Sequence, residues 1–252
     1  MKSLKQYIQE NLVIREDKTG YNYFPKTKKE LREIINQRIK DEGTEVDLND
    51  IDVSNITDMS YLFLSTNFNG DISNWDVSKV TNMSHMFAWC DNFNQDISDW
   101  NVSNVTDMSG MFKLCENFNQ NISSWNVSNV TDMSWMFKGC KKFNQNISSW
   151  NVSNVTNMEG MFYDCEKFNQ DISDWDVSNV TNMKYMFSRC KSFDGDISNW
   201  NVSNVTNMYN MFNGCKNFNQ DISKWNVSKV KFKDNMFNGC PIKDEYKPKF
   251  KK

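Results

Sequence analysis

The hydrophobic residues of this chain recur with a period of 25 residues. Seven tryptophans carry the period most clearly: Trp75, Trp100, Trp125, Trp150, Trp175, Trp200 and Trp225. The cysteines follow the same period and comprise Cys90, Cys115, Cys140, Cys165, Cys190, Cys215 and Cys240. A fixed period of this length is typical of a solenoid, because one unit cannot close a core by itself and must be covered by its neighbours.

Each unit contains two apolar patterns in succession. In unit 71–95, Ile72, Trp75 and Val77 show the alternation of a short strand with one buried face. The segment 81–90 then begins with a threonine suited to an N-cap and places apolar residues at i, i+3, i+4 and i+7, which indicates a short helix or a 3₁₀ turn. We therefore predict an α/β repeat solenoid of about eight strand-plus-short-helix coils, with the strands stacked into a parallel sheet.

Stacking of equal units places like residues over like residues. The tryptophans and cysteines are therefore predicted to form buried structural ladders. The cysteines occur once per coil, without any Cys-x-x-Cys pair and with a single histidine in the chain. A straight row of thiols does not supply a tetrahedral zinc site, and parallel side chains do not meet the geometry of a disulfide. We predict reduced core thiols, no metal and no cofactor.

The repeats span residues 51–240, and the flanking segments are predicted to act as ends of the stack. Residues 1–50 form an α+β N-terminal cap: a helix over 4–12, a hairpin about 17–20, and a capping helix. The capping helix begins with the box Thr27-Lys28-Lys29-Glu30, carries an apolar stripe and ends at Gly43. Residues 241–252 form a basic C-terminal tail with five lysines.

Charge and hydropathy limit the function classes. The formal net charge is -3, which does not favour nucleic acid as a partner. The N-terminal segment lacks the apolar core of a secretory signal, and no run approaches the roughly 20 apolar residues of a membrane span. We expect no membrane insertion, and a cytoplasmic or virion-associated location is favoured over secretion.

Catalysis is not predicted. His85 is the lone histidine, and no nucleophile elbow, zinc motif or phosphate-binding glycine loop accompanies it. Other copies carry tyrosine, tryptophan, glycine or asparagine at this position. His85 is therefore interpreted as an exposed variable residue rather than a catalytic one.

Two rows of residues drift between copies and are candidate partner-binding surfaces. The aromatic row comprises His85, Trp89, Trp135, Tyr163, Tyr185 and Tyr209. The acidic and amide row includes Asp76, Asp99, Asp174 and Asp176. Exposed aromatic residues are frequent anchors of protein interfaces. The alternative for the first row is ordinary scatter of surface residues, and for the second a solvated face with hydrogen-bonded ladders.

The units Val-Thr-Asn-Met-Ser-x-Met-Phe-x-x-Cys and Phe-Asn-Gln-Asp-Ile-Ser-x-Trp-x-Val-Ser closely resemble the BspA-like leucine-rich repeats, in the Met-Phe-Cys variant of mycoplasma-type surface proteins. The resemblance covers roughly residues 51–240 and implies a leucine-rich-repeat-like solenoid. It also implies attachment to host proteins or to other cells, as in many relatives, which are usually exported or lipid-anchored. Related repeats also occur in viral and phage genomes.

These observations predict a non-catalytic scaffold that binds or adheres to a protein partner. The alternative is a structural spacer or a virion or phage-associated component, for which the length and the ends of the solenoid would matter. Self-association through those ends is a further expectation.

Overall fold

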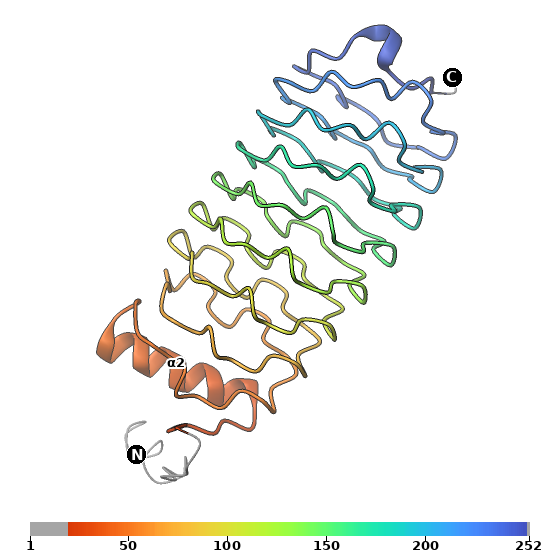
Figure 1. Ribbon diagram of the computed structural model, residues 1–252. Coiled ribbons are helices and arrows are strands. Elements are labelled where there is room, and N and C mark those ends of the chain that lie inside the picture. The colour runs from red at the N-terminus through yellow and green to blue at the C-terminus, as the bar shows by residue number, and fades with distance from the viewer. Residues whose placement is uncertain (1–19, 251–252) are drawn as a thin grey trace.

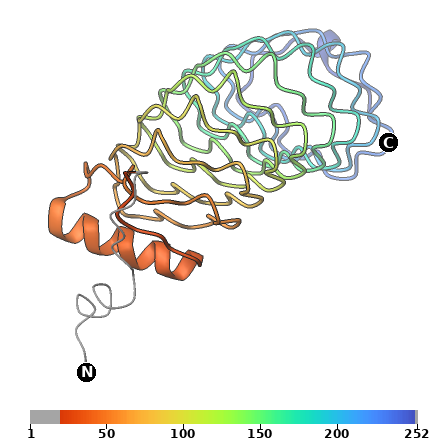
Figure 2. The ribbon, with the colours of Figure 1, turned by 60° about the horizontal axis from the view of Figure 1, so that its bottom comes forward.

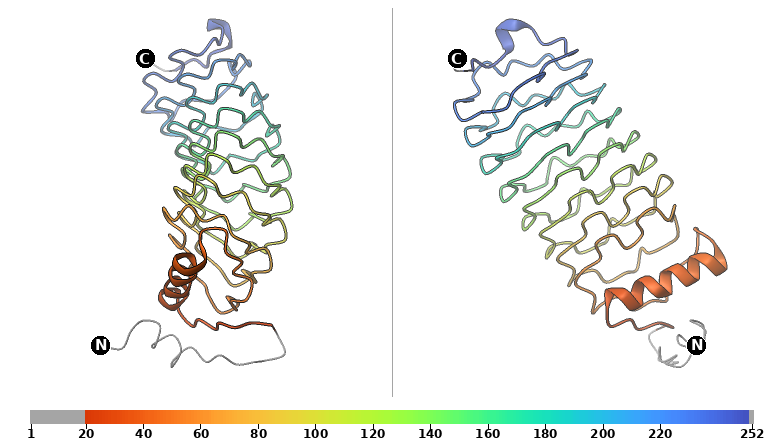
Figure 3. Two further views of the ribbon diagram at one scale, coloured as in Figure 1. Left: turned by 90° about the vertical axis from the view of Figure 1, so that its left-hand side faces the viewer. Right: turned by 180° about the vertical axis from the view of Figure 1, so that it is seen from behind.

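The computed structural model describes residues 20–250, and these form one elongated stack of coils (Figure 1). The coils lie in register along one axis, so that residues 25 positions apart stand over each other (Figure 2). Helix α2, Lys28–Glu42, lies across the N-terminal end, and the 3-10 helix η1, Asp244–Tyr246, lies at the other end (Figure 3). The repeat read from the sequence therefore produces a solenoid.

Within the described coils, the backbone consists of successive turns rather than helices or strands. In coil 71–95, the N–H of Met86 donates to the carbonyl of Met83, and the N–H of Cys90 donates to that of Phe87. Each bond joins residues i and i+3 and closes a β-turn. Of the two predicted alternatives, the short helix is not formed, and the i, i+3 bonds agree with the turn, which presents the same apolar spacing to the core.

The direction of the backbone hydrogen bonds explains the absence of a helix. The N–H of Met83 donates to the carbonyl of Asp107 in the next coil at 2.9 Å, and every second residue up to Trp89 donates to the next coil in the same way. These N–H groups would pair within the segment if it were an α-helix. Pairing between coils satisfies them instead, so the chain remains in turns.

The strand predicted around Trp75 is also absent. The N–H of Trp75 donates to the carbonyl of Ile72 at 3.2 Å, so the chain bends there. Neighbouring coils are connected by isolated parallel bridges, which link in succession Asp58, Asn82, Asp107, Asp132, Asn157, Asn182, Asn207 and Phe232. Parallel pairing thus exists as single bridges rather than a sheet, and it lies in the segment that the apolar pattern assigned to the helix.

Aromatic side chains form a continuous ladder through the core. Phe87 stacks on Phe93 of its own coil with ring centroids 3.9 Å apart, and on Phe112 of the next coil at 5.7 Å. The indoles of Trp75 and Trp100 stack at 6.5 Å with an interplanar angle of 3°. The seven repeat tryptophans are only 3–5 % exposed. Each coil therefore covers the rings of its neighbour, which explains how few apolar residues suffice for the core.

The polar atoms of the core are satisfied by the preceding coil. The indole Nε1 of Trp100 donates to the carbonyl of Ile72 at 3.2 Å. The thiol Sγ of Cys115 donates to the carbonyl of Phe87 at 3.0 Å. Both contacts recur from coil to coil, so the ladders of tryptophan and cysteine also hold the coils in register.

Helix α2 closes the N-terminal end of the stack. The hydroxyl of Thr27 accepts from the N–H of Glu30 at 3.2 Å, which is the bond expected of a capping box. Leu31, Ile34 and Ile35 are fully buried and join the same core as the first coil. The helix therefore shields apolar side chains that a further coil would otherwise have to cover.

The remaining predictions for the two ends have different outcomes. The helix over 4–12 and the first arm of the hairpin lie outside the described residues. Tyr23, in the expected second arm, forms a parallel bridge with Ile51. At the other end, Ile242 is 5 % exposed, and the carbonyl of Tyr246 accepts from the N–H of Ile222 at 3.0 Å. The basic tail thus packs in part against the last coils.

All seven cysteines are free thiols, and all except Cys240 are buried. Burial raises the pKa of the Cys140 thiol well above its ordinary value, and the neighbouring Cys115 acts in the same direction. A thiol whose pKa is raised by folding favours the folded state below its ordinary pKa of 9.0, and stability falls as the pH rises above that value. The thiols therefore remain protonated near neutral pH.

We expect the native protein at about pH 8 to resist alkylation by iodoacetamide at the buried cysteines, because the thiolate is the reactive form. Cys240 is half-buried and should react first. After denaturation, all seven thiols should be labelled. Timed alkylation followed by peptide mass spectrometry checks both statements, and rapid native labelling of Cys140, or a count below seven after denaturation, would contradict them.

Candidate binding surface

One surface of the solenoid is formed by the turns equivalent to residues 83–89, whose outward residues vary from coil to coil. We call this surface the turn face. In coil 71–95 its most prominent residues are His85 and Trp89. Their backbone lies in the left-handed region, with φ of 54° and 60°. Glycine adopts this conformation readily, whereas another residue is disfavoured by about 1–2 kcal/mol.

Large side chains nevertheless occupy the first left-handed position in several coils. The column reads Tyr61, His85, Gly110, Trp135, Gly160, Tyr185, Asn210 and Asn235, all with positive φ. The ring of one coil lies over the glycine of the next: a Cβ on Gly160 would stand 2.2 Å from Cε3 of Trp135. A Cβ on Gly110 would stand 1.8 Å from Nδ1 of His85. Glycine at these two positions therefore provides space for the preceding ring.

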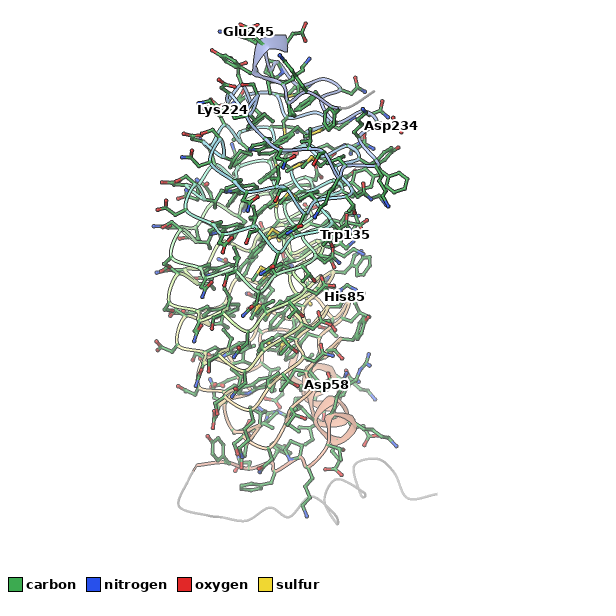
Figure 4. All side chains as sticks on the ribbon, turned by 90° about the vertical axis from the view of Figure 1, so that its right-hand side faces the viewer. Asp58, His85, Trp135, Lys224, Asp234 and Glu245 are labelled. Atoms are coloured by element: carbon green, nitrogen blue, oxygen red, sulfur yellow. The ribbon has the colours of Figure 1, made fainter. Side chains whose placement is uncertain are left out.

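Four of the predicted partner-binding residues form one contiguous group, which we call the aromatic strip: Trp135, Tyr163, Tyr185 and Tyr209. The ring of Trp135 lies 6.0 Å from those of both Tyr163 and Tyr185. The ring of Tyr185 lies 5.4 Å from that of Tyr209. All four side chains are half-buried. Figure 4 shows Trp135 at the edge of the solenoid.

Positively charged side chains lie over the rings of the strip. The Nζ of Lys138 is 5.0 Å from the ring centroid of Trp135 and 5.1 Å from that of Tyr163. The Nζ of Lys184 is 5.1 Å from the ring centroid of Tyr185. These distances are in the range of cation–π attraction. The strip therefore combines aromatic surface with positive charge.

Acidic residues partly balance this charge. The carboxylate of Glu159 lies 3.2 Å from the Nζ of Lys184. Burial raises the pKa of the Asp164 carboxyl, and the nearby Glu166 contributes to the increase. The turn face is thus mixed in charge, unlike a surface that follows nucleic-acid phosphates.

The strip ends at an open pocket that sequence reasoning missed. It has a volume of about 330 Å³ and is lined by Lys184, Tyr185, Asn207, Tyr209 and Phe232. Phe232 is 57 % exposed. Every other coil carries asparagine or aspartate at the position of Phe232. That single exception within the repeat was the signal available in the sequence.

His85 and Trp89 form a separate group, because Gly110 occupies the equivalent position in the intervening coil. The ring of His85 packs edge-on against Tyr61 at 5.0 Å, and Trp89 is 43 % exposed beneath the Nζ of Lys113 at 4.6 Å. The Nδ1 of His85 is buried without a hydrogen-bond partner among the described residues. Burial, followed by Lys113, lowers the pKa of His85, so the imidazole is neutral.

The predicted acidic row lies elsewhere. Its members Asp76, Asp99, Asp174 and Asp176 are exposed. The carboxylate of Asp76 accepts from the backbone N–H of Ser78 and closes a local turn. Hydrogen bonds from the side chain and backbone of Ser78 lower the pKa of Asp76. Lys224 occupies the same repeat position as two of these aspartates and lies on the side of the solenoid opposite to Trp135 (Figure 4). The two predicted rows therefore do not line one groove.

Within residues 20–250, no group of three or more histidine, cysteine, aspartate or glutamate side chains is arranged to hold a metal ion. In the same part of the chain, no helix has both the length and the apolar character needed to cross a membrane.

Comparisons with known proteins place the repeat in a family. No sequence among curated proteins matches this chain. Among solved structures, it is similar to the functional domain of InlJ from Listeria monocytogenes, described as including a cysteine ladder, with 12 % identity and a TM-score of 0.23. That similarity covers 74 % of this chain and 50 % of the other, so the chain spans about half the length of that domain. A family profile matches residues 30–148, 99–189 and 131–247, which together cover nearly all of the described chain. The chain therefore belongs to the family described as "Mycoplasma protein of unknown function, DUF285".

Proposed function

We propose that this protein is a non-catalytic scaffold that binds a protein partner through the aromatic strip. The observation that carries the proposal is the conformation of Trp135 and Tyr185, whose φ values are 58° and 59°. Gly110 and Gly160 fill the same position in adjacent coils, so the fold itself does not need an aromatic residue there. A bulky residue kept in a disfavoured conformation at the surface points to a functional role.

The composition of the strip supports a protein as the partner. Tryptophan, tyrosine and arginine are the residue types most enriched among interface residues with large binding contributions. Trp135, Tyr163 and Tyr185 contact one another, and Arg189 lies 5.8 Å from the ring of Tyr163. Side chains already held by their neighbours lose less conformational entropy on binding. The stacked coils therefore present an ordered contact surface.

The repeat pattern favours an adhesive role within this proposal. Its resemblance to BspA-like leucine-rich repeats favours attachment to a host protein or to another cell, whereas the matched family is described as of unknown function. The alternative is a structural spacer or virion component, for which the strip would have no partner. The proposal includes no catalytic step, cofactor or metal.

The test replaces both strained aromatics by the residue that neighbouring coils already carry. We expect Trp135→Gly/Tyr185→Gly to bind its partner at least about 30-fold more weakly, and about 1,000-fold if the two losses add, because interface anchors of this kind contribute about 2 kcal/mol or more each. Relief of backbone strain should offset part of the lost ring contacts, so thermal unfolding should change by only a few degrees. Pull-down from lysates of candidate hosts, followed by titration of the captured protein, measures the effect.

The chain offers a matched control for this experiment. His85→Gly/Trp89→Gly removes two left-handed aromatics from the separate group and should leave binding intact. Equal capture by the wild type and both double variants would overturn the assignment to the strip. Failure of every form to capture a protein would favour the spacer.

A further inference from the structure

On the turn face, the backbone N–H groups at the positions equivalent to 83, 85, 87 and 89 donate to the next coil, toward the C-terminal end. The N–H of Tyr185 donates to the carbonyl of Tyr209 at 2.9 Å, and the N–H of Asn210 donates to that of Asp234 at 3.0 Å. Each coil thus directs a row of N–H donors toward the C-terminal end of the stack. A stack built this way ends in a row of donors unless a further segment accepts from them.

The last coil ends in such a row. The backbone N–H groups of Lys233, Asn235, Phe237 and Gly239 occupy the donor positions, and none of them has an acceptor among the described residues. Lys233, Asn235 and Gly239 are exposed, and Phe237 is half-buried. Helix α2 covers the opposite end of the solenoid, so the two ends are not equivalent.

The sequence departs from the repeat at this same edge. Lys231, Phe232 and Lys233 replace the threonine, the asparagine or aspartate, and the buried methionine of the other full coils. Residues 221–252 contain nine lysines and four acidic residues, a formal charge of +5. Since the whole chain carries -3, residues 1–220 carry -8. The open end is therefore the basic part of an otherwise acidic protein.

We infer that the open edge of the last coil binds an acidic peptide segment of a partner, which follows the edge as a further coil would. Carbonyl oxygens of alternate peptide residues would accept from the four free N–H groups, as the next coil does elsewhere in the stack. Acidic side chains of the peptide would pair with Lys231 and Lys233. An apolar side chain would pack on Phe232, which also lines the pocket at the end of the aromatic strip.

Three observations favour a peptide over other occupants. The donors recur at every second residue, as do the carbonyls that the next coil offers elsewhere in the stack, so a continuous peptide backbone can supply the acceptors. The edge offers only N–H groups, so a second copy would have to present carbonyls, and its own N-terminal end is covered by α2. A free phosphate would satisfy the charge without using the row of donors or Phe232. This inference does not depend on the function of the strip.

The experiment measures binding of a fluorescein-labelled peptide of about ten alternating glutamate and valine residues by anisotropy. The full chain should bind it, and added salt should weaken the complex. Lys231→Glu/Lys233→Glu should reduce affinity at least about 10-fold, as expected when like charges replace two ion pairs at one site. The charge-matched control Lys224→Glu/Lys243→Glu should have little effect, because Lys224 lies on the opposite side of the solenoid.

A second pair of variants separates backbone donation from charge. Lys233→Ala removes the charge and its contact with the ring of Phe250, 4.6 Å away, whereas Lys233→Pro also removes the N–H, which has no partner among the described residues. The proline variant should bind about 5-fold more weakly than the alanine variant. Hydrogen exchange should show protection of segment 231–240 when the peptide is bound.

Several results would overturn the inference. These are equal affinity for a lysine–valine peptide, no added protection of segment 231–240, and displacement of the peptide by inorganic phosphate near its own concentration. A doubling of mass in light scattering that is abolished by Lys231→Glu/Lys233→Glu would show that a second copy occupies the edge instead. None of these results depends on the partner of the aromatic strip, whose binding to the wild-type protein is measured separately. Failure of one proposal can therefore be told from failure of the other.

Discussion

Replacing Phe137 by alanine is expected to lower the free energy of unfolding by about 3–5 kcal/mol, the range for a large aromatic residue removed from a core. Phe137 is fully buried at the centre of the stack. Its ring lies 4.1 Å from that of Phe143 and 5.8 Å from those of Phe112 and Phe162 in the coils on either side. The substitution therefore removes contacts with three coils at once and leaves a cavity that stacked rings cannot easily close.

Urea denaturation followed by circular dichroism measures this loss, and Phe237 provides the control. Phe237 occupies the same repeat position in the last coil, is half-buried, and stacks on Phe212 at 5.8 Å. Phe237→Ala should cost about 1–2 kcal/mol, because a partly exposed ring contributes less burial. Equal losses at the two positions would contradict a core that is continuous through the middle of the solenoid.

Replacing Gly70 by alanine is expected to destabilise the protein by about 3 kcal/mol, at the upper end of the range for overpacking. A Cβ at this position would stand 1.9 Å from the carbonyl oxygen of Val46 and 2.7 Å from Cε2 of Phe68. The first atom belongs to the backbone and cannot rotate away. Gly70 lies at the end of the first coil and packs against the segment that follows α2. Relief of the clash therefore requires these two segments to move apart.

Gly195 is the matched control for this prediction, because it occupies the same repeat position within the stack. A Cβ there would meet Cε2 of Phe193 at 3.0 Å and the carbonyl oxygen of Gln170 at 3.5 Å. Glutamine stands at this position in most other coils, including Gln170. Gly195→Ala and Gly195→Gln should therefore be tolerated. Thermal unfolding of the three variants compares them directly, and a Gly70→Ala protein as stable as the wild type would show that the segment following α2 does not pack on Gly70 as described.

The period of the repeat was sufficient to predict a stack of coils, since only stacking buries a single apolar row. The local structure of each coil was not predictable in the same way. Met83, Met86, Phe87 and Cys90 have the spacing of one helical face, and consecutive turns give that spacing as well. The choice between them depends on where the backbone N–H groups find acceptors. Those acceptors belong to the next coil, which a pattern within one coil does not contain.

The candidate surface residues were likewise predictable from the sequence only in part. Variation between copies identified the aromatic residues as outward positions, but their grouping required the path of the whole coil. Trp135 and Tyr185 belong to one cluster with Tyr163, whereas His85 belongs to another. The left-handed conformation at these positions has no sequence signature where an aromatic stands. Glycine or asparagine at the same position in other coils, as at Gly110, Gly160 and Asn210, was the trace of it.

The sequence by itself determined that units of 25 residues recur, which residues recur without change, and that α2 begins directly after its N-cap Thr27. The buried positions carry the same residue in nearly every coil, because each side chain packs against its equivalents in the coils above and below. Only the tertiary structure decided that the coils are built from turns, that the aromatic and acidic rows lie on different sides, and that the last coil presents unpaired N–H groups. These features depend on the direction of hydrogen bonds between coils, and that direction arises only when the units are stacked.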